Sequence, residues 1–327
     1  MALTFSRLSL ADTPEICNLL NRTWPAMYGK TGCPVFSQAF IDWLYGGPDA
    51  EQHFILGCRD ENGGLVGVKA ALFRQMSFQG QFHPAFLATH LAISNTLPLG
   101  VRLAAASELG KLHALEMDAK NVSLAFFETG KAIARNARRS AEKSGLYLAE
   151  IEFQQFVVNR RRLMAQPQDG QISVRPMQRD VAEVLVELRA GHAEDCLTWT
   201  PSPAALWHHV NAAPGAVALV AETEGKITGA VGAYVLEWRR EEVVSKMMIC
   251  DWITAATPGD LTALLRAVDG LVEGTGIRGI VVENASGLDE SFVTAGGLLK
   301  SPRSMIMAIR SKTSLPKTPA AYLGDIK

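Results

Sequence analysis

The sequence has few cysteines, and none of them form a close pair. Only five of its 327 residues are cysteine, and no two stand in a C-x-x-C spacing. An odd number without such a pair gives neither a disulfide framework nor a zinc site. We therefore expect a protein of the reducing cytoplasm that binds no metal.

Long apolar runs and an excess of one charge are also missing. No run approaches the ~20 apolar residues that cross a bilayer. Asp12 and Glu15 lie where a signal peptide would need an unbroken apolar segment. The 32 basic and 33 acidic residues give a formal net charge of −1. These absences argue against a membrane protein and against nucleic-acid binding over the whole surface.

What the sequence does contain is a repeat. The stretch CRDENGGLVG, residues 58–67, has a counterpart in VAETEGKITG, residues 220–229. In both stretches two glycines stand four residues apart, and each predicts two strands joined by a tight turn. Because the chain is longer than one hydrophobic core usually serves, a duplicated domain is a natural explanation.

Other segments repeat in the same order. Each half opens with a strand and a helix, and continues with a short helix around Trp43 or Trp207 and then the hairpin. Two more strands, a long amphipathic helix and an apolar strand ending at Glu128 or Glu283 follow. Segment 163–171 is polar and contains proline and glycine. We predict a linker there between an N-terminal domain, 1–162, and a C-terminal domain, 172–327, each with its own core.

The order of these elements resembles that of the GNAT superfamily of acyl-CoA-dependent N-acyltransferases. AETEGKITG, residues 221–229, is similar to the segment that joins the second and third strands there. NASGLDESFVTAGGL, residues 284–298, is similar to the family's ending, and ARRSAEKSGL, residues 137–146, is similar in the first half. The resemblance covers nearly the whole chain. It implies an α/β (α+β) fold of two tandem GNAT-like domains, each a mixed, mostly antiparallel sheet flanked by helices.

The resemblance also implies a place for a cofactor. In this family acyl-CoA lies in a V-shaped gap between two central strands, and its pyrophosphate sits on the N-terminus of the next helix. The family's phosphate loop is Gln/Arg-x-x-Gly-x-Gly/Ala. Here NTLPLGVR supplies one glycine but has Leu97 and Arg102 at two other motif positions. We expect acetyl-CoA or another acyl-CoA to contact Leu91, Ile93, Leu99, Gly100, Val101 and Arg102.

The second copy is a weaker candidate for the cofactor. Its segment AATPGDLTALL places Asp260 in the first turn of the helix, where a carboxylate would repel a pyrophosphate. Asp260 is most simply a helix-capping or first-turn residue. We expect this copy to be degenerate and mainly structural.

Acyl transfer to an amine needs a group that takes up a proton. By the resemblance, His90 and Asp251 fall on the fourth strand of each copy, and Glu128 and Glu283 end the fifth. Because histidine titrates near neutral pH, we place His90 and Glu128 first as catalytic candidates. A packed, structural histidine is the alternative for His90. The tyrosine that often protonates the leaving thiolate in this family is replaced by Ala141 and Phe292.

These observations favour an acyl-CoA-dependent N-acyltransferase that acetylates, or otherwise acylates, a small-molecule amine or a peptide. Two alternatives remain open. The missing tyrosine and the altered loop suit a non-catalytic ligand-binding or assembly protein. The altered loop and the basic clusters at 131–139 and 160–162 suit a transferase that uses aminoacyl-tRNA. The oligomeric state is not indicated.

Overall fold

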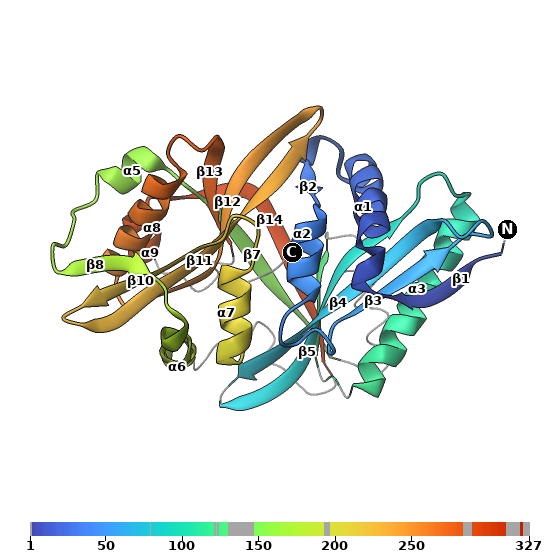
Figure 1. The fold of residues 1–327 in the computed structure, drawn as a ribbon, viewed down its shortest axis with the longest axis horizontal. Helices are drawn as coiled ribbons and strands as arrows, with labels where there is room; N and C mark the ends of the chain where they lie inside the picture. The colour runs from blue at the N-terminus through green and yellow to red at the C-terminus, as the bar shows by residue number, and fades with distance from the viewer. Residues whose placement is uncertain are drawn as a thin grey trace.

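The structure is a computed structural model that describes residues 2–78, 80–120, 122, 124–129, 147–192, 197–283, 290–311 and 321–322. It has two lobes that lie side by side, one built mainly by the first half of the chain and one by the second (Figure 1). We refer to residues 1–162 as the first copy and to residues 172–327 as the second copy. Among the described residues, no helix is both long and apolar enough to cross a membrane.

The first copy begins with a strand and a helix that are separated by a short 3-10 turn, and it ends with a long strand. Its elements are β1 (Thr4–Leu8), α1 (Thr13–Tyr28), β2 (Cys33–Val35), α2 (Gln38–Tyr45), β3 (Phe54–Arg59), β4 (Leu65–Phe78), β5 (Gln81–Ile93), α3 (Leu99–Ala119), β6 (Leu124–Thr129) and β7 (Tyr147–Val158).

The second copy repeats this order after the short helix α5 (Arg160–Met164). Its elements are β8 (Ile172–Pro176), α6 (Ala182–His192), β9 (Leu197–Trp199), α7 (Pro203–Asn211), β10 (Val217–Thr223), β11 (Lys226–Arg240), β12 (Val243–Ala255), α8 (Pro258–Val272), β13 (Ile277–Val282), α9 (Glu290–Ala295) and β14 (Leu298–Ser311), followed by β15 (Ala321–Tyr322).

Matched residues in the two copies produce matched local structure. The side chain of Ser37 accepts a hydrogen bond from the backbone at the start of α2, and Ser202 does the same at the start of α7. The two predicted hairpin turns place Gly63 and Gly225 at φ values of 81° and 74°, a conformation in which glycine has no steric penalty. The repeat read from the sequence is therefore a repeat of structure.

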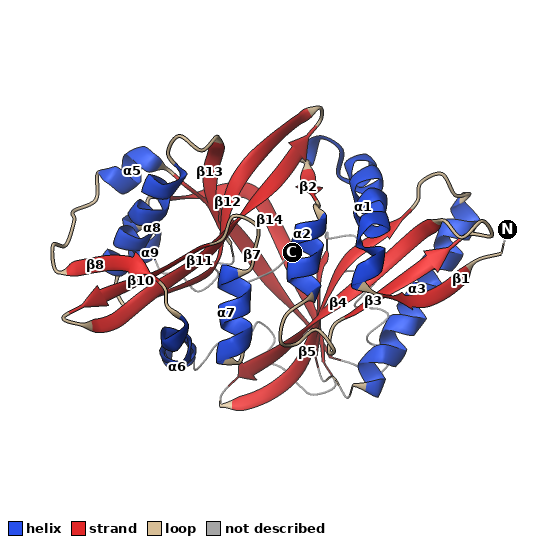
Figure 2. Ribbon diagram, viewed as in Figure 1, coloured by secondary structure: helices blue, strands red, loops and turns tan. Residues whose placement is uncertain are grey.

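The strands form one continuous sheet. Its order is β1-β3-β4-β5-β6-β14-β7-β13-β12-β11-β10-β8, with β2, β9 and β15 paired off this path. The pairs β5·β6, β12·β13 and β9·β15 are parallel and the others are antiparallel. Helices α1 and α3 contact β4, and α7 and α8 contact β11, so helices flank the sheet in both lobes (Figure 2). The predicted fold class is confirmed.

The two copies exchange strands, which corrects the expectation of two separate sheets. Strand β14 of the second copy lies between β6 and β7 of the first, and β7 pairs with β13. Two short strands also cross between the copies: β2 of the first copy pairs with β11 of the second, and β9 of the second copy pairs with β4 of the first. The boundaries 1–162 and 172–327 follow the sequence copies but do not divide the sheet.

The hydrophobic core is shared as well. The largest group of buried side chains contains Trp43 from the first copy and Leu206 and Trp252 from the second. Two smaller groups lie apart from it, one under α3 around Phe54 and Leu109, the other under α8. The group under α8 includes Phe156, which the exchanged strand β7 contributes from the first copy.

The predicted linker 163–171 is partly held in place. Leu163 belongs to α5 and is fully buried, which extends the ordered helix beyond the predicted start of the linker. The Nη2 atom of Arg266 on α8 donates to the carbonyl oxygens of Leu163, Met164 and Gln166, at 2.6–3.2 Å. The buried Leu163 side chain and the three carbonyl oxygens that accept from Arg266 anchor the first part of this segment to the second copy.

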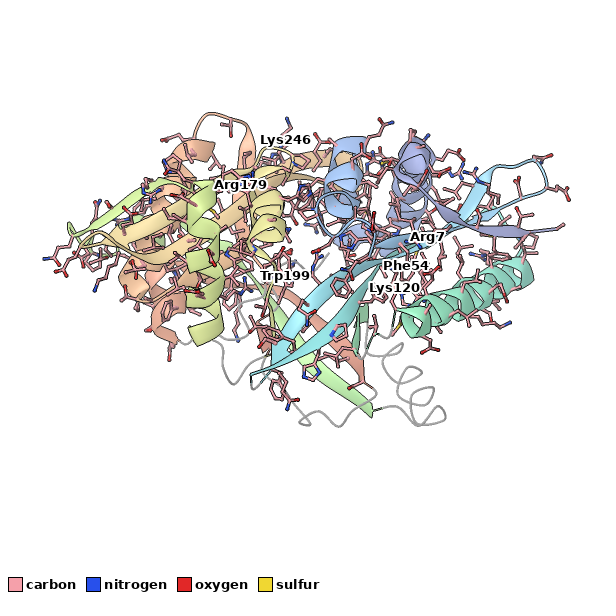
Figure 3. The ribbon with its side chains drawn as sticks, turned by 60° about the horizontal axis from the view of Figure 1, so that its bottom comes forward. Arg7, Phe54, Lys120, Arg179, Trp199 and Lys246 are labelled. Atoms are coloured by element: carbon pink, nitrogen blue, oxygen red, sulfur yellow. The ribbon has the colours of Figure 1, made fainter. Side chains whose placement is uncertain are left out.

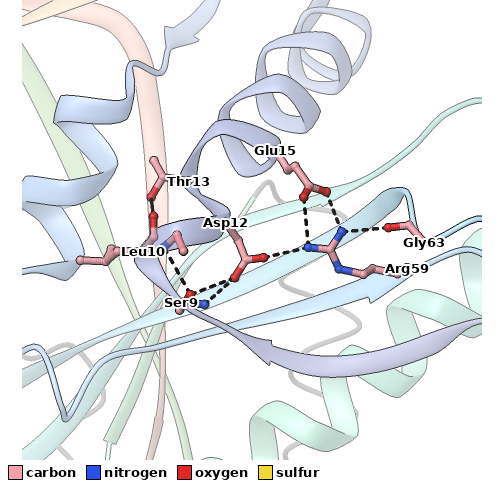
Figure 4. A network of polar contacts seen from close by, with 8 residues as sticks. Ser9, Leu10, Asp12, Thr13, Glu15, Arg59 and Gly63 are labelled. Atoms are coloured by element: carbon pink, nitrogen blue, oxygen red, sulfur yellow. Dashed lines mark hydrogen bonds and ion pairs between the residues drawn. The ribbon is translucent and has the colours of Figure 1, made fainter.

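The hairpin of the first copy is tied to the helix beside it. Arg59 donates to the carbonyl oxygen of Gly63 in the turn, and its guanidinium pairs with Asp12 at 2.8 Å and Glu15 at 2.6 Å (Figure 4). Asp12 also accepts a hydrogen bond from the backbone of Ser9. The network fixes the start of α1 relative to β3 and β4.

Candidate functional site

Two parallel strands of the first copy separate at the predicted place. Strands β5 and β6 pair only where Ala85–Ala88 faces Leu124–Phe127. Beyond this point β5 continues from Thr89 to Ile93, while β6 continues to Thr129 and pairs with β14. We call the place where this pairing ends, between Thr89–Ile93 of β5 and Glu128–Thr129 of β6, the notch. It lies where the resemblance predicts the V-shaped gap for acyl-CoA.

A β-bulge lies on the β5 side of the notch. Val68 pairs with Ala92 and Ala70 with Thr89, so two residues of β5, His90 and Leu91, stand opposite one residue of β4. Bulges of this kind interrupt the ladder of backbone hydrogen bonds and redirect a side chain. His90 has a φ of 51°, which is uncommon for a residue with a side chain and is typical of a constrained site.

The imidazole of His90 is enclosed by aromatic and hydroxyl groups. Its Nδ1 atom lies 2.6 Å from the Tyr45 hydroxyl and 3.0 Å from the Thr89 hydroxyl. Phe36 and Trp24 contact the ring on other sides. Burial lowers the pKa of His90 to about 3, so the ring is neutral at physiological pH. Its Nε2 atom has no hydrogen-bond partner among the described residues.

The other β5 residues expected to contact the cofactor differ in exposure. The Leu91 side chain is 45% exposed, and its carbonyl oxygen accepts a hydrogen bond from Trp24 Nε1 at 3.2 Å. Ile93 is half-buried and pairs with Gly67 of β4. Leu91 therefore offers an apolar side chain to solvent within the bulge, whereas Ile93 mainly packs.

The helix that follows the notch starts with an open end. Helix α3 begins at Leu99 with Pro98 as its N-cap, and no side chain caps it. Gly100 is exposed, and a Cβ atom built on it would meet nothing within 4 Å. Because the first backbone N–H groups of a helix have no partner within the helix, this end can bind an anion.

The remaining residues of the predicted loop have separate surroundings. Leu97 is buried in the core under α3, so it cannot replace a phosphate-binding Gln or Arg. Val101 is half-buried against the same core. Arg102 is half-buried, and its Nε atom has no hydrogen-bond partner among the described residues.

The corresponding helix of the second copy is closed. Thr257 and Asp260 form a reciprocal capping box at the start of α8. Asp260 is buried, and its second carboxylate oxygen accepts a hydrogen bond from the Thr228 hydroxyl at 2.6 Å. Asp260 is therefore a first-turn residue of the capping box, as predicted: its carboxylate accepts from the Thr257 N–H, and the Asp260 N–H donates to the Thr257 hydroxyl.

The second copy has a bulge at the position equivalent to His90. Cys250 pairs with Ala233 and Trp252 with Gly232, which leaves Asp251 in the bulge of β12. Its Oδ2 atom lies 3.1 Å from Nε2 of His209, and both side chains are buried. His209 on α7 stands where Tyr45 stands on α2.

The glutamates at the ends of the fifth strands also correspond. Glu128 lies on β6, one residue beyond the last pair with β5, and faces Met307 of β14 in register. Glu283 directly follows β13, and its backbone N–H donates to the Cys250 carbonyl oxygen. Gln155 from β7 donates to its carboxylate at 2.8 Å. The exchanged strand thus reaches into the second copy's equivalent of the notch.

The sequence analysis predicts His90 and Glu128 but not Tyr45, whose hydroxyl lies 2.6 Å from Nδ1 of His90. The sequence does contain a signal for Tyr45. Aligning the short helices on Trp43 and Trp207 places Tyr45 opposite His209, the residue that contacts Asp251. Ala141 lies outside the described residues, and Phe292 lies on α9. No group of three or more metal-ligating side chains occurs in the described part of the chain.

Comparison with solved structures identifies the fold. The N-myristoyltransferase of Saccharomyces cerevisiae, solved with bound myristoyl-CoA, matches with a TM-score of 0.68 and 11% identity, over 100% of this chain and 85% of that chain. A GCN5-related N-acetyltransferase from Anabaena variabilis ATCC 29413 matches with a TM-score of 0.58 and 11% identity, over 94% and 72%. No protein-family model and no curated protein match the sequence. The chain has the GNAT fold in two tandem copies.

Proposed function

We propose that the protein transfers an acyl group from a CoA thioester to an amine, and that the first copy binds the CoA. The amine nitrogen would form a bond to the thioester carbonyl carbon, the carbon–sulfur bond would break, and the products would be an amide and CoA thiol. Both solved structures compared above are N-acyltransferases by name, which supports the reaction class.

The observation that carries the proposal is the notch together with the open end of α3. Only five residues separate Ile93, at the end of β5, from Leu99, at the start of the helix. A thioester held at the unpaired edge of β5 would therefore have its pyrophosphate within reach of the free N–H groups of α3. The second copy has a bulge but no open helix end, because Thr257 and Asp260 cap it.

The amine must lose a proton during the reaction, and the two candidate groups are His90 and Glu128. Nε2 of His90 can accept this proton only while Nδ1 carries the ring hydrogen and donates it to the hydroxyl oxygen of Tyr45 or Thr89. The low pKa makes His90 a weak base, because efficient bases have a pKa near the working pH. Glu128 lies at the other wall of the notch.

The donor would be acetyl-CoA or another acyl-CoA, the acceptor a small-molecule amine or a peptide, and the compartment the cytoplasm. Leu91, which is 45% exposed, offers apolar surface at the notch. Apolar surface there would favour an acyl chain longer than acetyl. A series of acyl-CoA molecules of increasing chain length measures this preference.

Calorimetry with acetyl-CoA, longer acyl-CoA molecules and free CoA tests the proposal. We expect one site per chain. Gly100→Val should lower the affinity at least ~10-fold, about 1.4 kcal/mol, because a branched side chain keeps phosphate oxygens from the backbone. Its melting temperature should not change, since the added atoms meet open space. Absence of heat with every acyl-CoA would overturn the proposal, and a parallel titration with aminoacyl-tRNA would then separate the two alternatives.

A further inference from the structure

Three polar atoms meet at the bulge of β5, each close to the other two. The hydroxyl oxygens of Tyr45 and Thr89 lie 2.5 Å apart. Nδ1 of His90 lies 2.6 Å from the Tyr45 oxygen and 3.0 Å from the Thr89 oxygen. All three distances are those of hydrogen bonds, and a hydrogen bond needs a hydrogen between its two heavy atoms.

The two hydroxyl groups alone cannot give a hydrogen to all three contacts. Each hydroxyl has one hydrogen, and one of the two must lie between the oxygens of Tyr45 and Thr89. If Nδ1 of His90 were an acceptor, one of its two contacts would set a lone pair against a lone pair. A hydrogen on Nδ1 that both oxygens share, as in a three-centre bond, gives every contact a hydrogen. The geometry therefore favours the neutral tautomer with its hydrogen on Nδ1.

The other ring nitrogen of His90 is then an acceptor. His90 is 3% exposed, and Nε2 has no hydrogen-bond partner in the part of the chain that the structure describes. A buried acceptor without a partner costs free energy, which an N–H group of a ligand would recover. The tautomer thus decides whether Nε2 can accept a hydrogen or only donate one.

The position of Tyr45 depends on both copies. Helix α2 ends at Tyr45 and lies between α1 of its own copy and α7 of the second (Figure 3). Trp43 on this helix donates from Nε1 to the His209 carbonyl oxygen at 3.1 Å, and its own carbonyl oxygen accepts from Nε2 of His208 at 3.0 Å. These contacts with α7 hold the end of α2, and therefore the Tyr45 hydroxyl, in place.

We propose that Tyr45 and Thr89 are positioning residues, which hold His90 in the Nδ1–H tautomer so that Nε2 accepts a hydrogen from the amine of the acceptor. The hydroxyl pair acts through the imidazole and does not touch the amine. The contact with the amine rests on the proposed function, whereas the tautomer and its cause do not.

Nuclear magnetic resonance of the full chain with ¹⁵N-labelled histidine tests the tautomer without a ligand. The ring ¹⁵N shifts distinguish a protonated from an unprotonated nitrogen, and His90→Gln identifies the signals of His90. At neutral pH we expect hydrogen on Nδ1 and none on Nε2. A wild-type His90 with its hydrogen on Nε2 would overturn the proposal.

His53 is an internal reference for the opposite tautomer. Its Nδ1 accepts a hydrogen bond from the backbone N–H of Phe73 at 3.0 Å, so the hydrogen of the neutral ring is on Nε2. Burial lowers the pKa of His53 to about 3, which keeps the ring neutral at the pH of the experiment. The same spectrum should therefore show both tautomers.

Variants of the hydroxyl pair test the positioning role. Tyr45→Phe and Thr89→Val each leave one hydroxyl, which can donate to Nδ1 as well as accept from it, so the Nδ1–H form should lose population. In the double variant the Nε2–H form should become the major one. Phe36→Leu changes a ring contact of His90 without removing a hydroxyl, and should keep the wild-type tautomer. An unchanged tautomer in both single variants would overturn the positioning role, whether or not the double variant folds.

Turnover separates this proposal from the proposed function. In Tyr45→Phe and Thr89→Val it should fall in proportion to the lost Nδ1–H population, with unchanged affinity for acyl-CoA. A changed tautomer with wild-type turnover would overturn the contact between Nε2 and the amine. Absence of binding to every acyl-CoA would overturn the proposed function, and the histidine spectra would still decide the tautomer.

Discussion

The two copies share a bulge but differ in what surrounds it. In the first copy Tyr45 contacts a neutral His90, whereas in the second His209 contacts Asp251. The helix after the bulge is open in the first copy and closed by Asp260 in the second. The copy that keeps an open helix end can bind a ligand there, whereas the other copy caps the equivalent end with its own side chains.

This difference shows how a duplicated fold can specialise without losing its architecture. The capping box gives partners to backbone N–H groups at the helix start, and one of them, the N–H of Asp260, would otherwise be available to a pyrophosphate. The second copy therefore gains stability where the first copy keeps a binding site. Backbone N–H groups at a helix start can serve either ligand binding or helix stability. The first copy leaves these groups uncapped, and the second copy caps them.

The largest effect should come from the buried pair of the second copy. Asp251→Ala removes the carboxylate that contacts Nε2 of His209, whose side chain is 7% exposed, and should lower the free energy of unfolding by about 3 kcal/mol. Its counterpart in the first copy, Tyr45→Phe, removes a hydrogen bond between neutral groups and should cost only about 1 kcal/mol. Urea denaturation measures the free energy of unfolding of both variants. Equal losses would contradict the claim that the buried contact at the bulge is stronger in the second copy than in the first.

Two buried histidines of the first copy should make the free energy of unfolding depend on pH. Burial holds the pKa of His90 and of His53 at about 3, whereas an unfolded histidine has a pKa near 6.5. Between these values the unfolded state binds more protons, so stability is complete above pH 6.5 and falls as the pH drops toward 3. From pH 7 to pH 5 each histidine should cost about 2 kcal/mol. His90→Gln and His53→Gln should each reduce this slope, and a slope unchanged in both would contradict the assigned burial.

The cap of the second copy should have a smaller effect, confined to stability. Asp260→Ala removes the capping box and the bond from Thr228, and should lower the free energy of unfolding by about 1–2 kcal/mol. The affinity for acyl-CoA should not change. Gly100→Val is the matched variant, with normal stability and weaker binding. If Asp260→Ala instead weakens acyl-CoA binding, the assignment of the site to the first copy is wrong.

Much of the architecture could be predicted from the sequence because it depends on local patterns. Glycine turns, capping residues and apolar periodicity repeat in the same order, so the hairpins, the long helices and the cap at Asp260 were foreseeable. Alignment of the two fourth strands pairs His90 with Asp251 by position, and both residues lie in bulges.

The exchange of strands could not be predicted in this way. The β7 strand pairs with β13, so that Val157 faces Val281 more than a hundred residues away, and its alternating pattern is the same whichever sheet it joins. The contact between Tyr45 and His90 likewise depends on how α2 packs over β5. The local pattern of a single sequence does not indicate which distant segments pair or pack with one another.

Hydrogen exchange with and without saturating acyl-CoA tests the central claim most directly, because it reads both copies in one molecule. We expect new protection of backbone amides in residues 89–103, which span the bulge and the start of α3, and no change in residues 251–264, which are their counterparts. Protection confined to 251–264, or equal in the two segments, would contradict the account that only the first copy keeps the site.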